Sequence, residues 1–156
     1  MWKELTNLWK SDNLLVEAWE ESYEMLEIAQ EMFLEAVRIL RESDDMIVNW
    51  EIRRKDKKVN AYERNVRRKV MTHCTLQGPT VLPSGMVLVS IVIDIERIGD
   101  YCKNILDLAE VHPQHLSVPT YEEALAGIEE KIKKRFNTTI NVLKNQDVEK
   151  ARAMMS

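Results

Sequence analysis

The sequence predicts an all-α protein built as an antiparallel up-down helical bundle. Of its 156 residues, 45% are hydrophobic and 31% are charged, whereas only four are glycine and four are proline. Glu, Lys, Arg, Leu, Met and Ala, which favour helices, are used heavily. Apolar residues recur at three- and four-residue steps, the period of an amphipathic helix. Short connections between long helices favour antiparallel neighbours, which gives the up-down arrangement.

The first helix is predicted over about residues 12–42, where the apolar period runs from Leu15 to Leu40. Ser43 is predicted to cap the N-terminus of a second helix, because serine favours that position. The apolar positions of this helix carry it to about Leu76, and Gly78-Pro79 then ends it.

A third helix is predicted between Pro83 and Glu110, although its first turns are apolar on every side. The run 86–93 is rich in valine and isoleucine, so a β-strand is the competing interpretation. We favour a helix, because one apolar stripe continues from Ile91 to Ala109 without a turn signal.

Pro113 and Pro119 bracket the next connection, and a fourth helix is predicted to follow. The segment 120–123, Thr-Tyr-Glu-Glu, has the pattern of a capping box. The inward positions of this helix are predicted to be Leu125, Ile128, Ile132, Phe136, Ile140 and Leu143. Residues 145–147 predict a turn, with Asp147 as the cap of a last helix that reaches Ser156 without a stop signal.

Composition also restricts the function. Cys74 and Cys102 form no paired motif, which indicates a reducing compartment, and no run of 18 apolar residues predicts a membrane span. We therefore expect a soluble, cytoplasmic protein. The net charge of −4 argues against nucleic-acid binding. The histidines form no Glu-x-x-His motif and no serine or cysteine lies in a nucleophile motif, so we expect no enzyme.

The third helix carries a stripe of oxygen-bearing side chains, since Glu96, Asp100 and Asn104 are four residues apart. Like charges at this spacing cost roughly 0.2–0.5 kcal/mol, and Gly99 between them about 1 kcal/mol more relative to alanine. A bound cation would offset both costs, and Gly99 would let a ligand or another backbone come close. A solvated polar face opposite the core is the alternative explanation.

The second helix carries a matching set, Asp56, Asn60 and Glu63, on the shoulder of its apolar stripe. If the two helices pack antiparallel, the two sets face each other. Oxygen-rich ligation of this kind suits hard cations such as magnesium, calcium, manganese or iron. An ion pair with neighbouring basic residues is the alternative for Asp56. The predicted metal ligands are Glu96, Asp100, Asp56, Asn60, Glu63 and Asn104.

Basic residues are concentrated on the second helix, for instance at 53–55 and 67–69, whereas glutamates are concentrated on the first. We interpret this as charge complementarity between packed neighbours.

The two polar sets together carry a resemblance to a known family. The segment 56–63, Asp-Lys-Lys-Val-Asn-Ala-Tyr-Glu, followed by Glu-Arg-Ile-Gly-Asp at 96–100, resembles the PhoU-type phosphate-uptake regulators. The resemblance covers roughly 12–110 as one three-helix repeat. It implies a PhoU-like repeat at 1–115, followed at 116–156 by a fourth helix and the start of a truncated second repeat. It also implies multinuclear iron held by carboxylates, with zinc, manganese or magnesium as other possible ions.

The same resemblance implies the function. Proteins of this family regulate phosphate uptake and phosphate signalling negatively, with a phosphate ABC-transporter ATPase and a sensor histidine kinase as partners. A homodimer is expected. Two alternatives are a PhoU-like cytoplasmic domain of a sodium–phosphate cotransporter and a purely structural helical interaction module. The motif ahead of the third helix departs from the family, because 82–85 reads Leu-Pro-Ser-Gly where Asp-Leu-Arg is common.

Overall fold

The computed structural model describes residues 2–43, 50–112 and 114–155, with the side chains of the first helix described from Leu14 onward. These ranges contain α-helices and two short 3-10 turns and no strand. The helices are α1 (Trp2–Glu42), α2 (Trp50–Gln77), α3 (Leu82–Val111), α4 (Glu122–Asn145) and α5 (Val148–Met155). The 3-10 turns are η1 (Pro79–Val81) and η2 (Pro119–Tyr121). The predicted all-α fold is confirmed.

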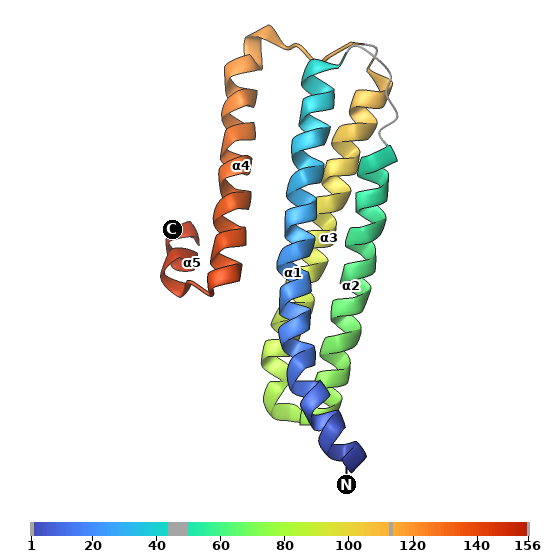
Figure 1. Ribbon diagram of the computed structural model, residues 1–156. Helices are drawn as coiled ribbons and strands as arrows, with labels where there is room; N and C mark the ends of the chain where they lie inside the picture. Colours follow the sequence, from blue (N-terminus) through green and yellow to red (C-terminus); the bar gives the residue numbers. More distant parts are fainter. Residues whose placement is uncertain (1, 44–49, 113, 156) are drawn as a thin grey trace.

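Three long helices form the body of the molecule, and a fourth is added to one side (Figure 1). α1, α2 and α3 all pack against one another, whereas α4 contacts only α1 among them. α5 follows α4 and turns back beside it. Within the described ranges, no helix combines the length and the hydropathy that crossing a lipid bilayer requires.

The core lies where the apolar faces of α1, α2 and α3 meet. On α1, the small side chains Ala18, Ala29 and Ala36 and the flexible side chains Met25 and Met32 are all fully buried. α2 contributes Ile52, Val59, Val66 and Val70, and α3 contributes Leu88, Val92, Ile95, Cys102 and Leu106. The apolar run 86–93 is helical, as predicted. Leu88 and Val92 are buried there, while Met86 and Val87 remain exposed.

The first helix begins earlier than predicted, whereas the predicted start of the second helix is not tested. α1 begins at Trp2 rather than near residue 12, because the preceding stretch contains no glycine or proline that would end a helix. The predicted start of the second helix at Ser43 runs into residues 44–49, which lie outside the described residues. Ser43 follows α1, and its backbone N–H donates to the carbonyl of Ile39 at 3.1 Å.

The predicted capping box at 120–123 is wrong. Thr120 lies inside η2, where the N–H of Tyr121 donates to the carbonyl of Val118 at 2.8 Å, and α4 begins only at Glu122 without a side-chain cap. Pro119 favours this tight turn, because its fixed φ suits a first helical position.

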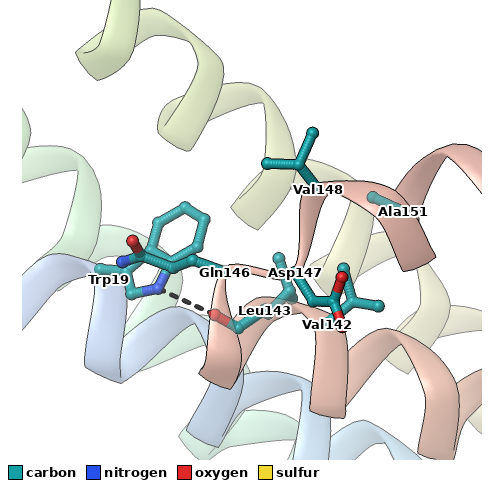
Figure 2. Close-up of a pocket in the computed structure, with 7 residues that line it drawn as sticks. All are labelled: Trp19, Val142, Leu143, Gln146, Asp147, Val148 and Ala151. Carbon is teal, nitrogen blue, oxygen red and sulfur yellow. Dashed lines mark hydrogen bonds between the residues drawn. The ribbon is translucent and has the colours of Figure 1, made fainter.

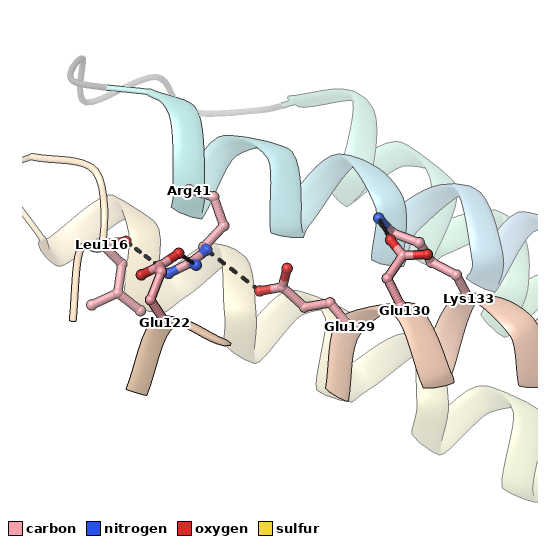
Figure 3. Close-up of polar contacts among 6 residues, drawn as sticks. All are labelled: Arg41, Leu116, Glu122, Glu129, Glu130 and Lys133. Atoms are coloured by element: carbon pink, nitrogen blue, oxygen red, sulfur yellow. Dashed lines mark hydrogen bonds and ion pairs between the residues drawn. The ribbon is translucent and has the colours of Figure 1, made fainter. Parts of the chain in front are cut away.

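Arg41 of α1 instead fixes the entry to α4 (Figure 3). Its guanidinium pairs with Glu122 and with Glu129, the latter at 3.4 Å, and donates to the backbone carbonyl of Leu116 at 2.9 Å. One arginine therefore ties the connecting loop and the first two turns of α4 to the end of α1.

Farther along, α4 is attached to α1 by aromatic and polar contacts. The rings of Phe33 and Phe136 lie 5.7 Å apart, and the indole N–H of Trp19 donates to the carbonyl of Leu143 at 3.2 Å. Phe136 and Ile140 are buried as predicted, but Ile128 is 53% exposed. The reason is that α4 packs on one neighbour only, so α1 covers only part of its apolar face.

The turn between α4 and α5 follows the prediction. Gln146 adopts a left-handed backbone conformation with φ +51°, which ends α4. The carboxylate of Asp147 then accepts the N–H of Lys150 at 3.0 Å, so Asp147 is the predicted N-cap of the last helix.

Replacing each of the two buried glycines of α3 by alanine should change the stability of the protein in opposite directions. A Cβ at Gly99 would lie 3.5 Å from Val59 Cγ1, an ordinary contact, so Gly99→Ala should stabilise the protein by about 1 kcal/mol through helix propensity. A Cβ at Gly85 would lie 2.7 Å from Cys74 Sγ and 2.9 Å from Val70 Cγ1. Valine is stiff at χ1, and overpacking costs roughly 1–3 kcal/mol, so Gly85→Ala should destabilise. Denaturant unfolding of both variants checks this, and a shift of the same sign in both would contradict it.

Candidate functional site

Four of the predicted ligands face one another across the interface between α2 and α3. Asp56 and Glu63 come from α2, and Glu96 and Asp100 come from α3; all four are partly buried. They meet because the two helices are antiparallel neighbours joined by a short connection, and because each set lies beside the apolar stripe of its helix. The predicted convergence of the two sets is therefore present.

A lysine lies among these carboxylates. The ammonium Nζ of Lys103 is 2.8 Å from Asp100 Oδ1 and 3.1 Å from Asp56 Oδ1, so it joins α3 to α2. Hydrogen bonding to Asp100, aided by Asp56, raises the pKa of Lys103 against the opposing effect of burial. Asp56 is therefore ion-paired, as the alternative for it expects, but with Lys103 of α3 rather than with a neighbouring basic residue of α2.

Glu96 is the least compensated member of the group. Desolvation by burial raises its pKa first, and the negative charges of Asp100, Glu63 and Asp56 raise it further. The positive charge of Lys103 opposes this shift without cancelling it. A raised carboxyl pKa marks a place where an additional cation would be favourable.

Glu63 and the two asparagines among the predicted ligands have partners on their own helix or lie at the margin of the group. Glu63 is paired with Arg67 of its own helix at 2.7 Å. The side-chain amide of Asn60 donates to the backbone carbonyl of Asp56 at 3.1 Å, which leaves its oxygen available. Asn104 is exposed, in a groove of about 520 Å³ that Asp100 and Lys103 also line.

The structure does not bring the predicted ligands into the geometry of a metal site. Among the residues it describes, no three Asp, Glu, His or Cys side chains lie close enough together to hold a metal ion. Lys103 and Arg67 supply two positive charges to the four carboxylates, so the group keeps an excess of negative charge.

Two basic residues of this region were missed from the sequence. Lys103 lies three residues after Asp100 and seven after Glu96, on the same face of α3, and this spacing could have indicated its role. Arg53 of α2 closes the far end of the groove, with pairs to Asp107 at 3.2 Å and to Glu110 at 2.8 Å. Its long side chain bridges the helices, and no pattern on α2 alone indicates that.

A second region of interest is apolar and lies where α1 meets the turn after α4. Figure 2 shows Trp19 beside this turn, in a cavity of about 440 Å³ lined also by Val142, Leu143, Val148 and Ala151. A larger neighbouring groove of about 700 Å³ shares Trp19 and Gln146. It is otherwise lined by Leu15, Val16, His73, Pro83, Ser84, Val87 and Leu88. His73 is buried in the last turns of α2.

Comparison with known proteins identifies one family. The family model of the PhoU domain matches residues 23–109. The match runs from the middle of α1 through α2 and almost to the end of α3, and it includes all four carboxylates and Lys103. Among curated proteins and among solved structures, none matches the chain.

The raised pKa of Glu96 predicts how stability depends on its charge. A carboxylate whose pKa is higher in the folded state destabilises that state once it ionises, so the cost appears as the pH rises through the raised pKa. In the presence of a chelator, Glu96→Gln should therefore raise the free energy of unfolding at neutral pH, by roughly 0.2–0.5 kcal/mol. The gain should vanish below about pH 4, where the carboxyl is protonated in both states.

Denaturant unfolding at the two pH values measures this effect. Asp94→Asn is the matched control, because Asp94 is an exposed carboxylate on the same helix that pairs with Arg97. A loss of stability in Glu96→Gln at neutral pH would show that the carboxylate is better compensated than its surroundings indicate.

Proposed function

The chain belongs to the PhoU domain family, and on that premise we propose that it is a regulatory adaptor of phosphate uptake and phosphate signalling. The observation that carries the proposal is the family match over α1, α2 and α3, with both polar motifs inside it. By this proposal the chain works in the cytoplasm, as a homodimer, and restrains phosphate uptake. Its partners are a phosphate ABC-transporter ATPase and a sensor histidine kinase.

The side chains of the α2–α3 interface support binding rather than turnover. Lys103 joins Asp56 of α2 to Asp100 of α3 and so holds the two helices together, while Glu63 is paired with Arg67 of its own helix. Burial raises the pKa of Cys102 to about 12, so this thiol stays protonated and is a poor nucleophile. These contacts suit a rigid body that presents its surface to other proteins.

Metal binding is a separate part of the proposal. The donors fit a hard cation, since Glu96, Asp100, Asp56 and Glu63 are carboxylates and the side chain of Asn60 has a free oxygen. Their arrangement does not fit one as it stands, because Lys103 already bridges Asp56 and Asp100. We propose that iron, or else zinc, manganese or magnesium, competes with this ammonium for the same carboxylates. A bound ion would supply the positive charge that Lys103 supplies now.

Deletion of the gene tests the regulatory role. If the chain restrains uptake, cells without it should take up radiolabelled phosphate faster when phosphate is abundant, and the intact gene should restore the lower rate. The carboxylate variant Asp100→Asn, which removes one partner of Lys103, should restore it less well than Asp94→Asn on the exposed side of α3. Unchanged uptake in the deletion strain would contradict the proposal.

Substitution of the lysine tests the competition with a metal. Lys103→Met keeps the unbranched apolar part of the side chain but removes the ammonium, so protein incubated with iron or manganese and then desalted should retain more metal than the unaltered chain. Adding Glu96→Gln and Asp100→Asn should abolish the gain, because two donors are lost. Elemental analysis gives the stoichiometry. Equal and negligible metal in all three proteins would rule out the metal site and leave the regulatory proposal standing.

A further inference from the structure

We propose that the outward face of α2 is a docking surface for anionic lipid membranes. The surface is a row of five basic side chains, here called the basic stripe: Arg54, Lys57, Lys58, Arg64 and Arg68. The inference uses only the charges and exposure of α2, so it does not depend on the proposed role in phosphate uptake.

The basic residues of α2 fall into two groups, apart from Arg67, which pairs with Glu63 of the same helix. In the first group, Lys55 pairs with Glu31 at 3.0 Å and Lys69 pairs with Glu17 at 2.8 Å, which is the complementarity with α1 expected from the sequence. Arg53 of the same group pairs with Glu110 of α3. The basic stripe is the second group. It points away from α1 and α3, so complementarity between packed helices explains only part of the basic charge of α2.

All five cations of the basic stripe are exposed, and within the described ranges none of them forms an ion pair with a carboxylate. Lys58 lies over the ring of Tyr62 at 5.5 Å, and Arg68 donates to the side chain of Asn65 at 3.0 Å. At the helical step of about 100° per residue, the five positions fall within an arc of about 120°, which keeps them on one side of the helix. The row is about 21 Å long at 1.5 Å per residue.

Two large apolar side chains continue the same face at its ends. Trp50, four residues before Arg54, is 75% exposed, and Met71, three residues after Arg68, is 64% exposed. Tryptophan is favoured at membrane–water interfaces, because its ring is apolar while its N–H prefers a polar neighbour. Clusters of four to eight Lys and Arg on a helix bind anionic lipid through the negative potential of the membrane surface.

The shape of this face favours a membrane over the other anionic partners. It is the outward side of a single helix, which can meet a flat surface along its length. α4 lies against α1, on the other side of the bundle, so it does not cover the face (Figure 1). With a net charge of −4, the chain as a whole is repelled by anionic surfaces, so attraction requires this one face to point toward the membrane.

Cosedimentation with vesicles tests the proposal. The unaltered chain should bind vesicles of phosphatidylcholine that contain phosphatidylglycerol, but not vesicles of pure phosphatidylcholine, and binding should weaken as salt is added. Arg54→Gln, Lys57→Gln and Arg64→Gln together should weaken it roughly a hundredfold, at about fivefold for each cation. Glutamine is a good helix former, and circular dichroism verifies that the fold is kept.

The matched control removes three exposed cations from α4, with Lys131→Gln, Lys134→Gln and Arg135→Gln. These residues likewise form no ion pair with any described residue, and the change in net charge is the same. The control should bind nearly as well as the unaltered chain. An equal loss in both triple variants, or no binding of the unaltered chain to anionic vesicles, would overturn the proposal. So would binding to polyglutamate or duplex DNA but not to vesicles.

Discussion

All the other long helices of this protein pack against α1, so the burial of its apolar face governs their arrangement. Three alanines on that face let neighbouring helices approach closely, while Met25 and Met32 fill the irregular space that remains. α2 and α3 are thereby held side by side and antiparallel. The polar side chains beside their apolar stripes must then lie opposite one another, and this brings the four carboxylates together.

The α2–α3 interface shows a balance between burial and charge. Carboxylates that are partly removed from water need cations nearby, and Lys103 provides one that reaches both helices. Because a lysine is a flexible point charge with three donors, it can serve two carboxylates without fixing either in a rigid geometry. Glu96 remains the side chain with the least support. Asp56 and Asp100 are thus paired with a cation at this interface, whereas additional positive charge near Glu96 would be favourable.

Much of the fold could be predicted from the sequence, because the apolar period of each helix is unbroken and Gly78-Pro79 marks a clear end. Asp56, Glu63, Glu96 and Asp100 were also placed together correctly, since antiparallel packing follows from a short connection. The spacing of Lys103 from Asp100 could have indicated their pairing, but not its contact with Asp56, because the reach of a lysine across an interface depends on the register of two helices. The exposure of Ile128 could not be predicted either: periodicity shows which face is apolar, not how many neighbours cover it. The capping box failed because Pro119 favours a 3-10 turn that the motif does not reveal.

The attachment of α4 to α1 alone has a consequence for the cooperativity of unfolding. α4 is held by the Phe33–Phe136 pair, by hydrogen bonds of Trp19 and Gln30, and by the ion pairs of Arg41 and Lys144, and all of these contacts are made to α1. Detachment of α4 therefore leaves the packing among α1, α2 and α3 in place. We therefore expect α4 and α5 to open as a unit at a lower free energy than the three-helix core.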